Sequence, residues 1–429
     1  MKTKHTHIKL SVLAVALSAA MGTQVHAQSF SEVVQNALAM YPSIQAVKAK
    51  TEAARADIDR ARAAHYPQIN YGYTRNSYAS GSLPSTVEAN TRSPLVRLNL
   101  WSGGRIEADA KRAEALTESS VFAEANTRDD VALLAAEAYI NWARSIDLFN
   151  LAVKNLESHS VTLEDIRKIV AVDTGRQIDL QQAQVRMDNA ALVKLQRETE
   201  LSQARQRLMR FWLGQLPTKP MGLTEALAAN GRLGQQVPRS IDQVMGAVND
   251  DLPVVAQQVK QVQAAEKAVS MARGQYSPTV DFTSARQLNL SGVAPYKQDT
   301  FSQVQVNMPL YNGGATSAAV DAAVSQLKAA QYALDEARLL AREKATVSYH
   351  EWVSTQGRAE QGASQAKVGD KVVDGYRQQF RLGRRQLLDL LNIQAEAFGY
   401  QSSATTAFYD EQVARARLLA ATGDLAKRF

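Results

Sequence analysis

Cysteine is absent from the 429 residues of this chain. Its absence excludes a disulfide framework, a thiol nucleophile and a thiolate metal site. It also leaves no side chain that could carry a lipid anchor on sulfur. An exported chain of this composition therefore has to be stabilised by its packing alone.

Long apolar runs are also missing. The longest candidate, Leu10–Ala20, has 11 residues, which is too short to span a bilayer. Three lysines precede or flank this run within the first nine residues, and small residues end at Ala27. This pattern predicts a secretory signal peptide over residues 1–27 and a mature chain that begins at Gln28. Beyond it no 18 consecutive residues are apolar, so a membrane crossing would need strands closed into a barrel.

Strong charge and catalytic motifs are lacking as well. The net charge is +7, and it falls to +4 without the three lysines of the signal, which argues against a nucleic-acid partner. The remaining histidines, His65, His159 and His350, are scattered and lack the spacing of metal ligands. No Gly-x-Ser-x-Gly or phosphate-binding loop is present. We therefore expect neither an enzyme nor a bound cofactor or metal.

The chain instead contains an internal repeat of about 210 residues. Pro42, Pro67 and Pro84 recur 211 residues later as Pro253, Pro278 and Pro295. Leu100-Trp101-Ser102-Gly103-Gly104 recurs 210 residues later as Leu310-Tyr311-Asn312-Gly313-Gly314. Each Gly-Gly is interpreted as a break between a strand and a long helix. Two copies of one supersecondary unit are therefore predicted.

Very long helices follow the two Gly-Gly pairs. Residues 105–174 contain neither glycine nor proline, which predicts a rod of roughly 105 Å. Apolar residues at seven-residue spacing, typical of a coiled-coil seam, occur at Phe149, Leu156, Leu163 and Val170. Gly175 and Gly383 are expected to reverse the chain at the rod ends. Return helices are predicted at about 178–213 and 386–425.

Four short segments alternate apolar and polar side chains. Their apolar positions are Ile69, Tyr71 and Tyr73; Val96, Leu98 and Leu100; Val280 and Phe282; and Val304, Val306 and Met308. This alternation fits both a water-filled membrane barrel and a half-buried sheet of a soluble domain. Aromatic residues near the strand ends, such as Tyr66, Trp101 and Tyr276, favour the membrane barrel. Because single-chain barrels start at about eight strands, several chains would have to share it.

The duplicated halves, the Trp-Ser-Gly-Gly and Tyr-Asn-Gly-Gly motifs and the glycine-closed rods together resemble the TolC-like outer membrane efflux and type I secretion proteins. The resemblance implies a mainly α fold with a small β part, in a homotrimer with one shared twelve-stranded barrel. It implies a long α-helical barrel through the periplasm. The implied partners are a periplasmic adaptor, an inner-membrane transporter of the ABC type and outer membrane lipid.

The resemblance also divides the chain. The expected parts are a signal peptide (1–27) and one TolC-like unit (28–429), made of a first repeat (28–213), an equatorial connector (214–240) and a second repeat (241–429), with strands within 67–101 and 278–311.

Site residues are assigned only through this resemblance. It implies an iris-like periplasmic gate in which Arg385 links to Asp179, and a pore constriction ring at Asp389. Two positions depart from the family pattern: Phe380 replaces a gate tyrosine, and Asn392 replaces a second ring aspartate. The tyrosine link is therefore expected to be absent, and the ring is expected to have three carboxylates per trimer.

The cargo is inferred by analogy. Without a cysteine for a lipid, and without a tail after the last helix, the chain looks more like ducts for type I protein secretion, including that of large adhesins, than like drug-efflux members. A duct for multidrug or small-molecule efflux is the alternative. A soluble periplasmic coiled-coil scaffold would explain the rods but not the aromatic-flanked strands.

Overall fold

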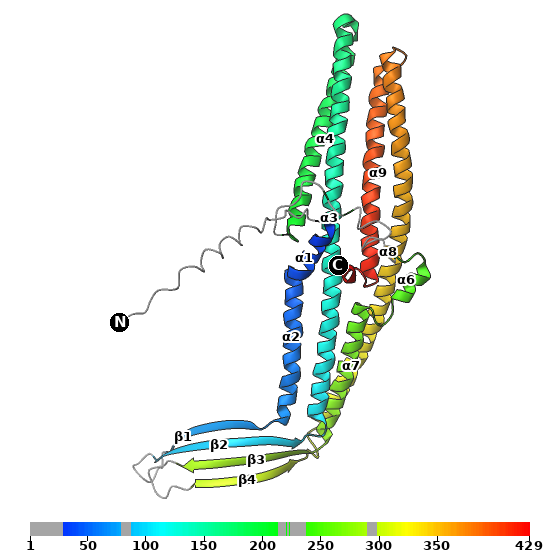
Figure 1. Cartoon of the computed structure of the whole chain (residues 1–429). Coiled ribbons are helices and arrows are strands. Elements are labelled where there is room, and N and C mark those ends of the chain that lie inside the picture. Colours follow the sequence, from blue (N-terminus) through cyan, green and yellow to red (C-terminus); the bar gives the residue numbers. More distant parts are fainter. Residues whose placement is uncertain (1–28, 79–86, 213–219, 221–222, 224–236, 290–297) are drawn as a thin grey trace, which may run out of the picture.

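The computed structural model describes residues 29–78, 87–212, 220, 223, 237–289 and 298–429. The predicted signal peptide and most of the predicted connector lie outside these residues. The molecule is elongated, with helices along its length and one sheet turned away from the helices at one end (Figure 1). Among the helices described here, none is both long and apolar enough to cross a membrane.

The two repeats build the same series of elements. The first contains α2 (Pro42–Arg62), β1 (Gln68–Tyr78), β2 (Val87–Trp101), α3 (Arg105–Val172) and α4 (Gln177–Met209). The second contains α7 (Pro253–Arg273), β3 (Thr279–Asn289), β4 (Gln298–Asn307), α8 (Ala315–Arg381) and α9 (Leu387–Ala421). The first repeat also contains α1 (Phe30–Met40), and the second also contains α6 (Ile241–Ala247), each ahead of this shared series. The predicted duplication, the mainly helical fold and the four strands are confirmed.

Proline and glycine place the helix starts. Pro42 and Pro253 each occupy the first helical position of α2 and α7, where a missing N–H costs nothing. Gly104 and Gly314 precede α3 and α8 in the left-handed region. A Cβ on Gly103 would lie 2.3 Å from the Cβ of Ser277, so only glycine fits where the two repeats meet. The Gly-Gly pairs are strand-to-helix breaks, as the sequence indicated.

The two chain reversals differ in mechanism. Gly383 has φ of 68°, and its N–H donates to the carbonyl of Phe380, as expected for a glycine that ends a helix. Gly175 is not left-handed. Instead, the Asp173 carboxylate accepts from the N–H of Gly175 at 3.1 Å, and this Asx-type turn caps a short 3₁₀ helix, Thr174–Arg176, that leads into α4. The assignment of both reversals to glycine conformation was therefore wrong for the first one.

The four strands form one antiparallel sheet in the order β1-β2-β3-β4. The β2–β3 pair, with Arg97 opposite Thr283, joins the two repeats. Its register places the alternating apolar residues on one face, so Ile69 lies opposite Val96, and Phe282 lies opposite Leu98 and Val304. The other face is mainly polar. The exposed apolar face is a large surface that no other described part of the chain covers.

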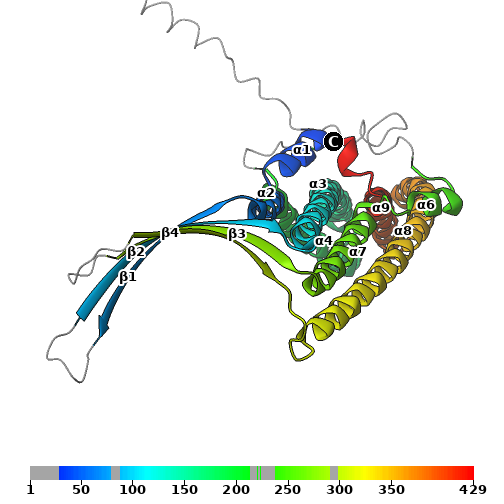
Figure 2. The ribbon, with the colours of Figure 1, turned by 90° about the horizontal axis from the view of Figure 1, so that it is seen from below.

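The helices pack against one another near the sheet and again in the middle of the molecule. Seen from below, α2, α3, α7 and α8 lie side by side, and the sheet curves away from one side of the helices (Figure 2). Halfway along α3, the Phe30 ring of α1 packs edge-on against Tyr139 at 5.3 Å. Arg417 of α9 bridges Glu137 of α3 and Glu351 of α8 at 2.7 and 2.9 Å. This middle region fixes the angle between the two long hairpins.

Candidate functional site

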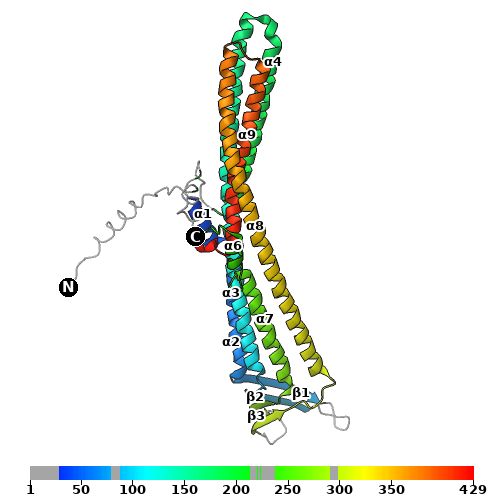
Figure 3. The ribbon, with the colours of Figure 1, turned by 90° about the vertical axis from the view of Figure 1, so that its right-hand side faces the viewer.

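The two helical hairpins, α3–α4 and α8–α9, end together far from the sheet (Figure 3). A buried apolar cluster joins them there. Its members are Leu163, Ile166, Val170, Ala183, Phe380, Leu387, Leu390 and Leu391. Because these side chains come from all four helices, the two tips form one packed unit. All five residues assigned by resemblance lie in this region.

Phe380 belongs to the interior of this tip. It is only 5% exposed and packs in the cluster one residue before the end of α8. An apolar ring suits this position, whereas a buried hydroxyl would require a partner. Its observed role is therefore packing, and it offers no polar contact to the tip.

Arg385 lies in the turn between α8 and α9 and makes three contacts within the chain. Its Nη1 is 3.6 Å from Asp389 Oδ2, and its Nε donates to Gln379 Oε1 at 3.2 Å. Its guanidinium carbon also lies 3.9 Å from the centre of the Tyr376 ring. These contacts come from both flanking helices. They hold the guanidinium against the last turn of α8.

Asp179 lies in the first turn of α4, where a carboxylate is favoured by the helix dipole. Its Oδ2 is 2.7 Å from Nη2 of Arg176, three residues earlier. In the described part of the single chain, Asp179 and Arg385 thus pair with other residues and not with each other. A link between them across two copies stays a prediction.

Asp389 and Asn392 lie on the first turns of α9. The Asp389 side chain is 45% exposed, so it is open to solvent apart from its contact with Arg385. Asn392 accepts from Nη2 of Arg186 at 3.3 Å, which ties α9 to α4. Asn392, which stands where the family pattern has a second aspartate, thus makes a hydrogen bond between the two hairpins. A constriction ring formed by Asp389 remains a prediction.

Two features of the tip were not found from the sequence. The first is Tyr376, which lies four residues before Phe380 and carries the ring under Arg385. The second is a buried polar layer behind the tip, in which Gln394 donates to Ser158 and Thr162 at 3.2 and 3.0 Å. Arg377 also donates to Ser158, at 2.8 Å. The signal for Tyr376 was its spacing, since residues four apart share a helix face.

His159 adjoins this polar layer and is 4% exposed. Burial and the nearby positive charge of Arg186 lower the pKa of His159 below its ordinary value. The imidazole is therefore neutral at pH 7, and adding a proton to it would place a charge inside the packed hairpins.

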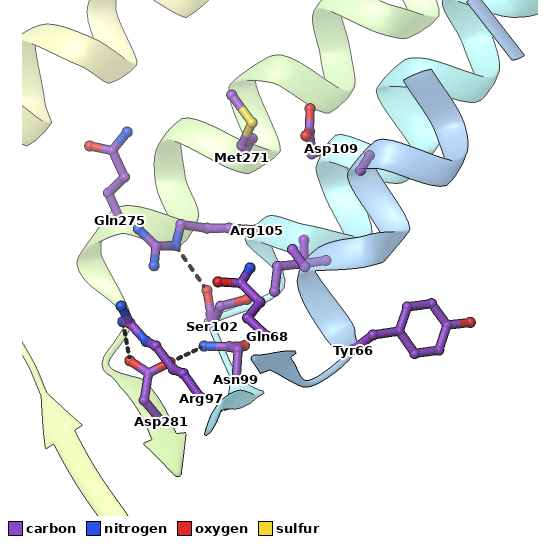
Figure 4. A pocket seen from close by; sticks show the side chains of 13 residues that line it. Tyr66, Gln68, Arg97, Asn99, Ser102, Arg105, Asp109, Met271, Gln275 and Asp281 are labelled. Carbon is purple, nitrogen blue, oxygen red and sulfur yellow. Dashed lines mark hydrogen bonds and ion pairs between the residues drawn. The ribbon is translucent and has the colours of Figure 1, made fainter. Parts of the chain in front are cut away.

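A hollow lies at the other end of the helices, where the sheet meets them (Figure 4). Its volume is about 440 Å³. Asp281 of β3 accepts a hydrogen bond from Asn99 at 2.9 Å and forms an ion pair with Arg97 at 3.2 Å. Both partners belong to β2, so these contacts connect β2 to β3 through side chains. Arg105 Nε donates to the Ser102 carbonyl at 3.1 Å and anchors the start of α3. These contacts make the hollow a polar joint between the repeats.

Among the described residues, no group of three or more His, Asp or Glu side chains could hold a metal ion.

Comparison with known proteins agrees with the geometry. The profile of the family described as outer membrane efflux protein matches residues 33–214 and 250–424. Outer membrane efflux protein BepC of Brucella suis biovar 1 (strain 1330) is 27% identical over 372 residues, covering 85% of this chain and 78% of BepC. Outer membrane protein TolC of Vibrio cholerae serotype O1 is 23% identical over 435 residues, covering 97% and 96%.

A solved structure shares the fold. The open state of the Neisseria gonorrhoeae MtrE outer membrane channel superimposes with a TM-score of 0.80 at 16% identity, covering 94% of this chain and 90% of that one. Proteins of the matched family are channels and not enzymes, and they are components of tripartite efflux or secretion systems. The profile match includes both repeats, which argues against a soluble scaffold. The chain belongs to the outer membrane efflux protein family, and it lies in the outer membrane and extends into the periplasm.

Proposed function

We propose that three copies of this chain form an exit duct whose outer end is a closed twelve-stranded barrel. The observation that carries this proposal is the four-stranded sheet, whose outer strands β1 and β4 each pair on one side only among the described strands. One face of the sheet is apolar and exposed. Unpaired edges cannot lie in lipid, so copies must join edge to edge. Channels of this family form trimers, and three times four strands gives twelve.

The tips are the proposed docking site for a periplasmic adaptor and, through it, an inner-membrane transporter of the ABC type. Channels of this family work with both classes of partner. The supporting observation is the exposure of large apolar side chains at the tips. Val172 is 90% exposed, Leu382 68% and Ile178 64%. Exposed apolar groups at a periplasmic end favour contact with another protein.

We further propose that the duct opens by an iris-like movement of the tips. Arg385 and Asp179 of neighbouring copies would exchange their partners within the chain for each other in the closed state. Asp389 would supply a ring of three carboxylates in the pore, which attracts cations. A single exposed ion pair contributes about 0–1 kcal/mol, but the threefold repeat adds to the bias between the two states.

The proposed cargo is protein, delivered by a type I secretion transporter, with a large adhesin as one candidate. It rests on the lack of a cysteine for lipid attachment and on likeness to secretion ducts. Small-molecule efflux is the second candidate. The observation in its favour is the description of the matched family and of BepC as efflux proteins.

Deletion of the gene, with wild-type rescue, tests the cargo. Quantitative mass spectrometry of the culture supernatant and of the cell surface should show loss of one large protein, restored by rescue. An unchanged protein profile together with greater drug susceptibility would overturn protein secretion in favour of efflux. The duct itself is tested with detergent-extracted protein, which should sediment as a trimer and conduct ions in a planar bilayer. A monomer without conductance would overturn the duct.

A further inference from the structure

The two repeats are joined to each other side by side near the sheet. There the helices lie in the order α2, α3, α7 and α8, and the strands lie in the order β1, β2, β3 and β4 (Figure 2). The internal joint therefore consists of α3 and β2 of the first repeat against α7 and β3 of the second. The repeat makes α8 and β4 equivalent to α3 and β2, and α2 and β1 equivalent to α7 and β3. One chain thus carries both halves of a second joint, on its two outer sides.

The equivalence of the repeats holds residue by residue in the sheet. Gln68 lies opposite Arg97 in the first hairpin, and Thr279 lies opposite Asn307 in the second. Thr279 comes 211 residues after Gln68, and Asn307 comes 210 residues after Arg97. These are the offsets that relate the prolines and the Gly-Gly motifs. The register of one strand pair can therefore be transferred to its equivalent.

The register of β2 with β3 then gives the register of β4 with β1 of a second copy. Leu95 lies opposite Ala285 in the internal joint. The equivalent residues are Gln305 on β4 and Thr74 on β1, both exposed in one chain. Both are polar and lie on the polar face of the sheet, so the transferred register keeps the two faces of the sheet separate.

The outer edge of β4 also ends early. The next transferred pair, Val306 with Tyr73, joins two exposed residues of the apolar face. Beyond it β4 stops at Asn307, whereas the equivalent strand β2 continues to Trp101 in its pairing with β3. Tyr311, the equivalent of Trp101, is 88% exposed, compared with 45% for Trp101. Strand β1 of a second copy would give this segment the partner that the described part of one chain does not supply.

Small side chains line the outer sides of α8 and α2 near the sheet. On α8 the exposed small residues are Ala315, Ala318, Ala322, Ser325 and Ala329. On α2 they are Ala46, Ala49, Ala53 and Ala56. In both helices the spacing alternates between three and four residues, so each set lies along one side of its helix. Small residues at a contact allow two helix axes to approach closely.

The equivalent positions are buried in the internal joint. Ala108, Ala115 and Ser119 of α3 are buried there. The hydroxyl of Ser119 donates to the carbonyl of Gln257 of α7 at 3.2 Å. The equivalents of these four residues are all small and exposed in one chain: Ala318, Ser325, Ala329 and Ala46. The surface by which the first repeat binds the second is thus present again, uncovered, on the outer sides.

Close to the sheet the two joints differ in a way that preserves the fit. A Cβ on Gly274 would lie 2.6 Å from the Cγ of Arg105, so the internal joint has no room for a side chain opposite this arginine. The equivalent residues of the second joint are Ala63 and Ala315. The methyl group added at Ala63 is thus accompanied by the loss of a long side chain at Ala315, and the volumes compensate.

We propose that the chain binds a second copy of itself by repeating its internal joint, with β4 and α8 of one copy against β1 and α2 of the next. The two sides are complementary to each other and not to themselves, so copies associate head to tail and a ring closes the series. The inference rests on the proposed barrel and adds to it a register, with Gln305 opposite Thr74, and a helix contact, with Ala329 against Ala46.

Cysteine cross-linking tests the register, because the chain has no cysteine of its own. Opposite residues of antiparallel strands have Cα atoms about 4.5 or 5.5 Å apart, and both distances suit a disulfide. The full-length channel with Q305C/T74C, purified in mild detergent and oxidised, should therefore form covalent dimers and trimers that reduction separates. Strands β1 and β4 lie at opposite edges of one sheet, so this bond cannot form within a chain.

The matched control for the sheet is Q305C/N70C. Its second cysteine lies on the same face of β1 but four residues away, roughly 13 Å along the strand, and should give no cross-link. The helix contact is tested in the same way. A329C/A46C should cross-link, whereas A329C/A53C, in which the second cysteine is two turns away, roughly 10 Å, should not. Electrophoresis without reductant measures the linked fraction, and mass spectrometry identifies the linked peptides.

Conductance in planar bilayers, recorded for the wild type and for each reduced variant, separates this inference from the proposed duct. Cross-links at the two predicted pairs, and not at the two controls, would support the repeated joint. A conducting trimer that links at the control pairs, or at none of the four pairs, would overturn this inference alone. A wild type that stays monomeric and does not conduct would overturn both the inference and the duct.

Discussion

The guanidinium of Arg385 is stacked over the ring of Tyr376, with its central carbon 3.9 Å from the ring centre. Tyr376 lies four residues before the buried Phe380 on α8, so Phe380 holds the helix end and Tyr376 supports the arginine. The ring thus fixes the direction in which the charge of Arg385 points. A cation–π contact at an exposed site is worth about 0.5–1 kcal/mol.

Replacing Tyr376 tests this support. We expect Y376L to release Arg385 and to raise the fraction of open channels, because about 0.5–1 kcal/mol is lost in each of three copies. Y376F keeps the ring face and should behave as the wild type. Single-channel recording in planar bilayers measures the open fraction. Equal open fractions in Y376L and Y376F would show that the ring does not position the arginine.

The proposed link between Asp179 and Arg385 calls for a double-mutant cycle. Both residues have partners within the chain, Arg176 and Asp389, so single changes disturb more than one contact. We expect D179N and R385Q each to favour opening, and the double variant to open little further than either one. The cycle isolates a coupling of about 0.5–1 kcal/mol per pair. Strictly additive effects would mean that the two side chains do not meet in the trimer.

Charge in the constriction is tested in both directions. D389N removes the three proposed ring carboxylates and should lower the preference for cations, which shifts the reversal potential in a salt gradient towards zero. N392D adds three carboxylates next to Arg186 and should raise that preference. D370N, which changes an exposed acid on α8, is the control. Unchanged reversal potentials in D389N and N392D would place both residues outside the pore lining.

Much of the fold could be predicted from the sequence because its signals are local. Pro42 and Pro253 fix helix starts, the Gly-Gly pairs fix strand-to-helix breaks, and period-two alternation fixes which strand face is apolar. Each of these signals depends on the backbone preference or polarity of a few neighbouring residues. Because the chain is duplicated, the signal for each of these elements occurs twice, and the two copies support the same prediction.

Side-chain partners were not predictable in the same way. Gly175 and Gly383 look equivalent in sequence, yet Asp173 makes the first reversal without a left-handed glycine. Arg385 was assigned to Asp179 by resemblance, whereas in one chain its neighbours are Tyr376 and Asp389. Which partner a side chain contacts depends on the rotation of its helix and on how the hairpins pack together. A short stretch of sequence determines neither of these.

Asp129 gives the last prediction, on stability and pH. This residue of α3 is 7% exposed, and its Oδ1 accepts from the backbone N–H of Ala426 at 2.7 Å. Burial raises the pKa of Asp129 from 3.8 to about 6, although that hydrogen bond and Lys427 oppose the rise. Because the folded state binds the proton more tightly, this contribution to stability is full below pH 3.8. It decreases as the pH rises to about 6, where the folded protein also loses the proton.

D129N should remove this loss, because the amide keeps a carbonyl oxygen for Ala426 but carries no charge at any pH. A pKa difference of one unit between the folded and unfolded chain corresponds to about 1.4 kcal/mol of stability. With a shift from 3.8 to about 6, the free energy of unfolding of D129N should exceed that of the wild type by at most about 3 kcal/mol above pH 6. Thermal unfolding of the detergent-solubilised trimer between pH 4 and 8 measures the difference. D59N, which changes an exposed acid on α2, is the control. If the difference in stability between D129N and the wild type were the same at pH 4 and pH 8, the folded and unfolded chains would bind the proton of Asp129 equally, and burial would not shift its pKa.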